Sequence, residues 1–379
     1  MIFSRRAGAL HEPPNALGKL VAHARAAGGL LDLAVGNPTA AGIPYEHDTI
    51  LRALAKPESL TYAPEPLGLP SARIAAAAVH GIDPASVAIT ASTSEAYGVL
   101  FKLLCDPGDE VLVPVPSYPL LAWLAALESV KLVPYPLVYA GGWHVDVAAL
   151  REAVTPRTRA IVVVAPNNPT GSYLGREELD AMLDLGLPIV SDEVFATYPL
   201  GELGEDRVKT SLIADRGTVF ALSGLSKLVG LPQLKLGWIA CGGERARIPE
   251  TMERLETVLD AYLSVGAPVQ HALPELLAAG KTTAEAIRVR TRANLATLRA
   301  MCAGTSATVL AAEGGWYAIL RVPETESDEA WAERLVREEN VHVQPGFFFD
   351  LVRGAHLVVS LLTPEADLAA GVARILSRV

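Results

Sequence analysis

The sequence predicts an α/β fold in which a mostly parallel, open sheet is followed by a smaller α+β domain. Continuous apolar runs recur along the first two thirds of the chain, and helix-length patterns separate most of them. Strands covered on both faces are typically apolar throughout, and strands that alternate with helices form parallel sheets. After residue 241 the pattern changes to long helical stretches, which indicates that a second domain follows.

Seven apolar runs are expected to form the strands of the sheet. They cover residues 87–90, 110–115, 130–135, 160–165, 188–191, 218–222 and 236–241. Before them, residues 15–28 predict an amphipathic helix, because Asn15 can cap its start and Gly28 follows its last apolar position. A short strand from residue 31 should stop at Gly36, where a missing side chain either lets the backbone approach a ligand or makes a simple turn.

The last third of the chain predicts a different arrangement. Two long helices are expected at residues 249–263 and 268–303, and two strands at residues 316–321 and 356–361. A helix lies between these two strands in the sequence and another follows them. This order of elements is typical of an α+β unit.

Composition excludes several classes of protein. The chain has 379 residues and a net charge of −10, which argues against a nucleic-acid-binding surface. Its three cysteines are far apart and show no metal-binding spacing, so we expect no metal site. The N-terminus lacks an apolar stretch long enough for a signal peptide, and no run approaches the length needed to span a bilayer. We therefore expect a cytoplasmic protein.

Ligands bind at the carboxyl ends of the strands in open α/β sheets, so the residues that follow each strand are the candidates for a site. Lys227 follows the apolar run 218–222 in a glycine-containing turn. An amine there can attack a carbonyl compound. The alternative is an ordinary solvated lysine, which is the commoner case.

Two other strand ends carry groups suited to a flat, anionic ligand. Thr93 and Ser94 lie in a hydroxyl-rich turn that opens a helix, which suits a phosphate but is also the chemistry of a helix cap. Tyr118 lies in a proline-rich loop where its ring can cover a flat cofactor, or simply face solvent.

Asn168 and Asp192 follow two further strands. Asn168 precedes a turn-forming proline and can donate to a phenolate-like oxygen, although a bare turn would use the same residues. Asp192 ends an apolar strand, where a carboxylate is costly unless it is paired; a protonated heteroaromatic nitrogen is a suitable partner.

Together these groups describe a ligand with a phosphate, a flat ring, a ring oxygen, a ring nitrogen and an aldehyde, which is pyridoxal phosphate. The cofactor is an electron sink, and the protein supplies a lysine and a carboxylate for the pyridinium nitrogen. Burial and neighbouring positive charge would lower the pKa of Lys227 and leave its amine neutral for proton transfer.

On these motifs the chain resembles the class I/II aminotransferases of the fold-type-I pyridoxal-phosphate enzymes over nearly its whole length. The resemblance implies a large domain with a seven-stranded, mostly parallel sheet, a small domain built from both termini, and a homodimer with active sites at the subunit interface. Residues 1–45 would form an arm and part of the small domain, residues 46–265 the large domain, and residues 266–379 the rest of the small domain.

The resemblance also implies roles for single residues. Lys227 matches the lysine that binds the cofactor covalently and moves a proton between substrate and cofactor. The other matches are Asp192 at the pyridine nitrogen, Asn168 at the ring hydroxyl, Tyr118 stacked on the ring, Thr93 and Ser94 at the phosphate, Ser226 beside the lysine, and Tyr62 reaching the partner subunit's phosphate.

Three positions depart from the pattern of the family. Lys235 stands where an arginine is usual and can hold a phosphate only as a point charge. Phe195 replaces a tyrosine that bonds the ring oxygen, which should raise the pKa of the cofactor–lysine link. Val358 replaces the arginine that clamps the substrate carboxylate; Arg353 or His356 lie close enough in sequence to substitute for it, unless Arg353 is merely a surface residue.

The resulting hypothesis is an aminotransferase that moves an amino group between an amino donor and a keto acid. The missing clamp predicts an unusual substrate, such as an amine, an amino-sugar-like compound or a modified amino acid. A lyase or decarboxylase on the same scaffold is the alternative, since the cofactor chemistry is shared. A non-catalytic, regulatory pyridoxal-phosphate binder is a third reading, disfavoured because the chain has no room for an added DNA-binding domain.

Overall fold

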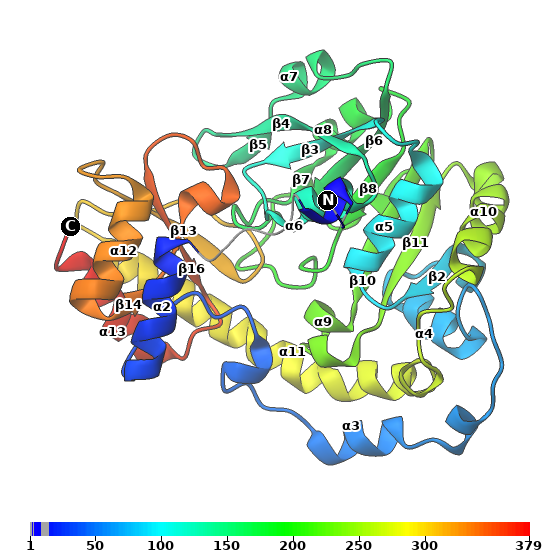
Figure 1. Ribbon diagram of the computed structural model, residues 1–379, viewed down its shortest axis with the longest axis horizontal. Helices are drawn as coiled ribbons and strands as arrows, with labels where there is room; N and C mark the ends of the chain where they lie inside the picture. The colour runs from blue at the N-terminus through cyan, green and yellow to red at the C-terminus, as the bar shows by residue number, and fades with distance from the viewer. Residues whose placement is uncertain (1, 3, 9–14) are drawn as a thin grey trace.

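The computed structural model describes residues 2, 4–8 and 15–379 of the chain. Two layered units are joined by one long helix (Figure 1). The larger unit is a sheet with helices on both faces, and the smaller unit is a four-stranded sheet with helices packed against it. The α/β class predicted from the sequence is confirmed, including the mostly parallel large sheet.

The large sheet has eight strands among the described residues, in the order β2-β11-β10-β8-β6-β3-β4-β5. All seven predicted runs are strands, and six of them are mutually parallel, with β11 antiparallel. The eighth, β5, is an antiparallel edge strand that the apolar pattern did not predict. The strands are β2 (Val87–Thr90), β3 (Glu110–Val115), β4 (Lys131–Tyr139), β5 (Trp143–Val145), β6 (Thr158–Val164), β8 (Ile189–Asp192), β10 (Thr218–Gly224) and β11 (Gly237–Gly243).

Alternate residues of the central strands pack into different cores. In β3, Val111 and Val113 belong to the core cluster that includes Tyr97, Leu100 and Phe101, whereas Leu112 belongs to a separate cluster on the other face. A strand with two covered faces must be apolar at every position, which explains the continuous runs in the sequence. The covering helices are α4 (Pro70–His80), α5 (Thr93–Leu104), α6 (Leu120–Leu127), α7 (Val147–Glu152), α8 (Arg176–Leu183) and α10 (Ile248–Asp260).

The small unit combines segments from both ends of the chain, and its four-stranded sheet comes from the C-terminal part. Its strands lie in the order β12-β13-β16-β15, and the predicted pair becomes β13 (Tyr317–Val322) antiparallel to β16 (Ala355–Ser360). The N-terminal helix α2 (Ala16–Ala27), capped by Asn15 as predicted, packs in the same core. The remaining elements of this unit are β1 (Leu31–Asp32), β12 (Thr308–Val309), α12 (Asp328–Glu339), β14 (Val341–His342), β15 (Gln344–Pro345) and α13 (Glu365–Leu376).

The strand expected from residue 31 to Gly36 is shorter than predicted. Only Leu31 and Asp32 pair, in parallel with β14. The Asp32 carboxylate lies 2.8 Å from Nδ1 of His342 and accepts a hydrogen bond from Arg25 at 2.6 Å. Burial alone would raise the pKa of Asp32, but these contacts outweigh it and lower the pKa well below its usual value. These contacts therefore tie β1 to helix α2 and to β14.

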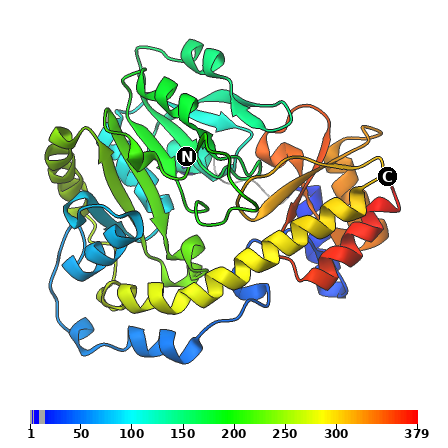
Figure 2. The ribbon, with the colours of Figure 1, turned by 180° about the vertical axis from the view of Figure 1, so that it is seen from behind.

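Helix α11 (Ala267–Cys302) spans both units. It runs from beneath the large sheet to the small one, where it contacts α13, and at its other end it contacts α4 and α3 (His47–Leu54) (Figure 2). In the part of the chain that the structure describes, no helix is long and apolar enough to cross a membrane.

Candidate active site

Lys227 lies directly after β10, in the short helix α9 (Leu225–Leu228). Its Nζ lies 5.0 Å from the centroid of the Trp316 ring and 5.7 Å from that of Phe195. Protein surrounds the amine, and this burial lowers its pKa, against a smaller opposing effect of the Asp192 carboxylate. The hydroxyl of Tyr198 donates to the Lys227 carbonyl at 2.7 Å and holds the turn in place.

Asp192 ends β8, the parallel neighbour of β10, where it stands opposite Leu222. Its Oδ1 accepts from the Val194 amide at 3.2 Å and its Oδ2 from the Tyr97 hydroxyl at 3.3 Å. Burial raises the pKa of this carboxyl to about 6, and the Lys227 charge counteracts part of that rise. Among the described residues no cationic side chain bonds to it, so it can accept a charged ligand.

The N-terminus of α5 lies beside the start of β11. Ser92 caps the helix, its Oγ accepting from the Glu95 amide at 3.2 Å, so Thr93 and Ser94 stand in the first turn. Amide groups of a first helical turn have no carbonyl partner within the helix and suit an anion. Gly237 makes this approach possible, because a Cβ there would lie 3.1 Å from the Thr93 nitrogen.

Asn168 and its neighbour Asn167 differ in a way that the sequence did not indicate. Asn167 is structural: its Nδ2 donates to the Pro116 carbonyl at 2.9 Å and to Thr170 Oγ1 at 3.0 Å. The Oδ1 of Asn168 is buried and has no hydrogen-bond partner among the described residues. A buried polar atom needs a partner, and rotation of the amide by 180° would place its N–H₂ donor at the same position.

Tyr118 follows β3 and is 49% exposed. Its ring lies 6.4 Å from that of Phe349, and the amide of the preceding Ser117 donates to the Phe349 carbonyl at 3.0 Å. The loop therefore meets the small unit, at the turn that follows β15. On the same side, Gly36 makes room for Tyr317, since a Cβ on Gly36 would lie 2.6 Å from the Tyr317 hydroxyl.

Four other predicted positions differ in their surroundings. Ser226 is half-buried beside Lys227, whereas Lys235 is exposed and has a left-handed backbone (φ 50°). Tyr62 is 84% exposed. Arg353 lies in an exposed loop and makes no hydrogen bond or ion pair with any described residue. The structure therefore does not bring Arg353 into contact with the groups around Lys227.

Val358 is fully enclosed in an apolar cluster. It pairs with Ile319 across the small sheet and packs with Trp143, Phe349 and Leu351, leaving 1% of its surface exposed. His356, two residues earlier on the same face of β16, is buried, and this burial lowers its pKa. A neutral histidine and an aliphatic side chain are poor ligands for a carboxylate.

The sequence did not indicate two of the aromatic residues that border Lys227 and Asp192, namely Trp316 and Tyr97. Tyr97 stands one helical turn after Thr93, a spacing that places the two on one face of α5. Trp316 packs edge-on against Phe195 at 5.2 Å and Tyr198 at 5.2 Å. The helical spacing could have found Tyr97; Trp316 comes from a distant segment and had no local signal.

These residues fit pyridoxal phosphate. Four groups lie at or just after the ends of the strands β10, β8, β6 and β2 of the large sheet. They are a desolvated amine, a buried carboxyl without a cationic bonding partner, an unpartnered buried amide oxygen and a helix N-terminus. They match the aldehyde, ring nitrogen, ring oxygen and phosphate of that cofactor. When bound, the cofactor supplies an electron sink for charge developing on the substrate carbon.

Several known proteins with similar sequences or structures are aminotransferases. The profile of the family described as "Aminotransferase class I and II" matches residues 29–375. An alanine aminotransferase from Mycobacterium tuberculosis is 29% identical over 371 residues, covering 91% of this chain and 84% of that protein. A glutamate-pyruvate aminotransferase from Escherichia coli is 29% identical over 269 residues, covering 68% of this chain and 66% of that protein.

Solved structures give the same fold. An alanine aminotransferase from Pyrococcus furiosus superposes with a TM-score of 0.87 at 24% identity, covering 99% of both chains. A mutant aspartate aminotransferase from Thermus thermophilus superposes with a TM-score of 0.86 at 25% identity, covering 100% of both chains. The fold and the family match define a pyridoxal-phosphate-dependent transferase. The chain belongs to the class I and II aminotransferases, which move an amino group between an amino donor and a keto acid.

Proposed function

We propose that Lys227 is the lysine that binds the cofactor and carries the proton in transamination. Its lowered pKa supports this role, because a neutral amine can both attack a carbonyl and accept a proton. Asp192 holds the positive charge of the pyridine nitrogen, and Asn168 bonds the ring oxygen. The single observation that carries the proposal is the buried amine of Lys227 at the end of β10, beside the buried carboxyl at the end of β8.

The remaining residues bind and orient the cofactor. The first turn of α5, with Thr93 and Ser94, holds the phosphate, and Lys235 and Ser226 complete its binding site. Tyr118 covers the face of the ring. Because Phe195 has no hydroxyl, the ring oxygen receives one hydrogen bond fewer, and the cofactor–lysine link should keep its proton to a higher pH.

The substrate side of the site supports an unusual amino donor. Val358 presents an aliphatic side chain within an apolar cluster where the family usually has its carboxylate-binding arginine. Gly36 and Tyr317 border the same side, and Arg353 stands in the exposed loop from which it would have to move to replace the clamp. A site without a cation at position 358 suits an amine, an amino-sugar-like compound or a modified amino acid better than a free α-carboxylate.

A donor panel tests this function. The protein loaded with pyridoxal phosphate is incubated with amino acids, including the alanine and glutamate suggested by its relatives' names, and with primary amines. A stoichiometric amino transfer to a keto acid supports transamination. Release of ammonia or carbon dioxide without transfer supports the alternative of a lyase or decarboxylase. This alternative is more credible here than in a family member that has the arginine at the position of Val358.

Replacing Val358 with arginine should shift selectivity toward α-amino acids. A guanidinium that bonds a carboxylate is worth about 1.5–3 kcal/mol, so we expect kcat/KM for α-amino acids to rise about 10- to 100-fold relative to amines. Val289, which is exposed on α11, gives the matched control: Val289→Arg should leave selectivity unchanged. An unchanged ratio in a folded Val358→Arg protein would refute the role of position 358.

A second comparison avoids the cost of burying an arginine. In the wild-type protein, kcat/KM is measured for an amino acid and for the amine that lacks only its carboxylate. We expect a difference below about 10-fold, because Val358 cannot form an ion pair with the carboxylate. A difference of about 1000-fold in favour of the amino acid would show that another group, such as Arg353, supplies the clamp.

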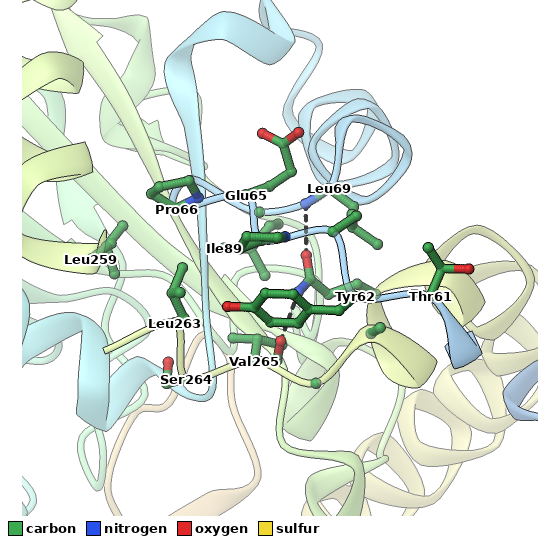
Figure 3. A pocket seen from close by; sticks show the side chains of 16 residues that line it. Thr61, Tyr62, Glu65, Pro66, Leu69, Ile89, Leu259, Leu263, Ser264 and Val265 are labelled. Carbon is green, nitrogen blue, oxygen red and sulfur yellow. Dashed lines mark hydrogen bonds between the residues drawn. The ribbon is translucent and has the colours of Figure 1, made fainter. Parts of the chain in front are cut away.

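We also propose a homodimer whose active sites are shared. A hollow of about 230 Å³ is bordered by Tyr62, Glu65, Leu263, Ser264 and Val265 (Figure 3). It shares no lining residue with the group around Lys227. Leu60 and Tyr62 beside it are strongly exposed apolar residues, which is typical of an interface. In a dimer, Tyr62 would reach the partner subunit's phosphate site.

Sedimentation equilibrium gives the direct test of this assembly. We expect a mass of two chains for the wild type, and a weaker dimer for Leu60→Asp, because a charge would then be buried in the interface. Ile74→Asp, another exposed apolar residue, is the control. A monomeric wild-type protein that still binds the cofactor tightly would contradict the proposed role of Tyr62.

Two further proposals concern the organisation of the chain. The division at residues 45 and 265 is supported by the separate cores of the two sheets, since α2 and β1 pack with the small sheet. A cytoplasmic location is supported by the three cysteines, all of which are free.

A further inference from the structure

Tyr97 is the one tyrosine on helix α5 and it is almost completely buried, with 3% of its surface exposed. Its hydroxyl lies 3.3 Å from Oδ2 of Asp192. Because Tyr97 stands four residues after Thr93, both side chains leave the same face of the helix. Helix α5 therefore reaches the candidate phosphate site with its first turn and the candidate ring-nitrogen site with its second.

The surroundings of Asp192 leave Tyr97 as its side-chain donor. Val194 provides a backbone N–H to Oδ1. Glu193 is engaged elsewhere, since its Oε1 accepts from Ser191 Oγ at 3.0 Å and from the amide and hydroxyl of Ser211 at 2.7 Å. Lys227 acts on Asp192 through its charge. Within residues 15–379, no other side chain donates a hydrogen bond to the Asp192 carboxylate.

We propose that Tyr97 is a positioning residue that keeps the Asp192 carboxylate charged and oriented toward the nitrogen of the cofactor ring. This inference rests on the proposed role of Asp192. One carboxylate oxygen is then held by the Val194 amide and the other by the Tyr97 hydroxyl, so the carboxylate cannot rotate freely. A lone pair remains for the protonated ring nitrogen.

The chemistry of the phenol suits this role. Burial, with a further effect of the Asp192 charge, raises the pKa of Tyr97 well above its usual value, so the hydroxyl stays protonated and always donates. A donor at a buried carboxylate stabilises its charged form. Without it the carboxyl would bind a proton more readily, and its attraction for a pyridinium would fall.

Tyr97→Phe tests the proposal in the cofactor-free and the loaded protein. In the cofactor-free wild type, the free energy of unfolding falls with rising pH up to the pKa of Asp192, which is about 6. Loss of the donor should raise this pKa, so in Tyr97→Phe the fall should continue to a higher pH. In the loaded protein, we expect the Kd for pyridoxal phosphate to rise about 3- to 10-fold, as for a long hydrogen bond to a charged group. The increase should be larger at pH 6 than at pH 8, where Asp192 is charged in both proteins.

Tyr135→Phe is the matched control. Tyr135 is equally buried, but its hydroxyl donates at 2.8 Å to a backbone carbonyl, that of Val162. Its loss should lower the free energy of unfolding by the same amount at every pH between 5 and 8. A second control is Tyr97→Phe in an Asp192→Asn background, where the change should no longer alter the pH dependence.

The outcomes distinguish a failure of the inference about Tyr97 from a failure of the proposed function. If Tyr97→Phe behaves like Tyr135→Phe in both measurements, Tyr97 only fills space and the inference is wrong. If the wild-type protein does not bind pyridoxal phosphate, the proposed function fails, whereas the pH dependence of the cofactor-free protein still reports whether Tyr97 acts on Asp192.

Discussion

Replacing Lys227 with alanine is expected to abolish transamination, with a loss of about 10⁴-fold or more. The amine at this position both binds the cofactor covalently and moves the proton. Its removal should therefore slow the reaction at least as much as removal of a group that acts only as a general acid or base. Lys227→Ala should also lack the visible absorption band of the cofactor–lysine link. Cofactor affinity should fall less steeply, since the phosphate and ring contacts remain.

Two control variants make this result specific. Lys19→Ala changes an exposed lysine of helix α2 and should leave both the band and the rate unchanged. Lys227→Arg keeps a long basic side chain beside Trp316 and Phe195 but cannot form the link, so it should be as inactive as the alanine variant. A normal absorption band in Lys227→Ala would assign the link to another lysine and overturn the site.

Replacing Asp192 with asparagine is expected to have opposite effects on the cofactor-free and loaded proteins. In the loaded protein the ring nitrogen loses its anionic partner, and breaking a buried charge pair should weaken cofactor binding about 100-fold or more. In the cofactor-free protein the same change removes a buried charge that lacks a bonded cation, so the free energy of unfolding should increase.

The pH dependence gives the direction of the stability change in the cofactor-free protein. Burial raises the pKa of Asp192 from 3.8 to about 6, so between these values the folded protein binds more protons than the unfolded chain. The stability of the cofactor-free wild type therefore falls as pH rises from about 4 to 6 and then stays level with respect to this group. Asp192→Asn should lack this fall and be more stable at pH 7 by about 2 to 3 kcal/mol.

Urea denaturation of both cofactor-free proteins at several pH values measures this difference, and Asp215→Asn, in an exposed loop, serves as the control. Equal stability of Asp192→Asn and wild type at pH 7, together with equal slopes against pH, would show that the Asp192 carboxyl is solvated like an ordinary surface acid.

Much of the fold could be predicted because the central strands are buried on both faces. That condition leaves continuous apolar runs, and β3 shows how both faces contribute to separate cores. The edge strand β5 was missed because an edge position does not require the same apolar run. The length of β1 was overestimated, because an apolar stretch does not show where its partner strand ends. Only two residues of β1 pair.

The candidate site could be predicted where its residues follow strands in chain order, as Lys227 and Asp192 do. Parallel strands bring such residues to one edge of the sheet whatever their separation in sequence. Contacts such as Tyr97 with Asp192, or Trp316 with Lys227, depend on side-chain packing between distant segments. The same limit applies to Val358, whose apolar surroundings from β5 and β13 are visible only in the structure.

The identity of the lysine that binds the cofactor is the most direct test of this account. The protein is loaded with pyridoxal phosphate, reduced with borohydride to fix any link to an amine, digested, and analysed by mass spectrometry. We predict that the modified peptide carries the cofactor on Lys227 and that excess amino donor, added before reduction, removes the modification. A modification on Lys235 or another lysine, or none in a protein that binds the cofactor, would contradict it.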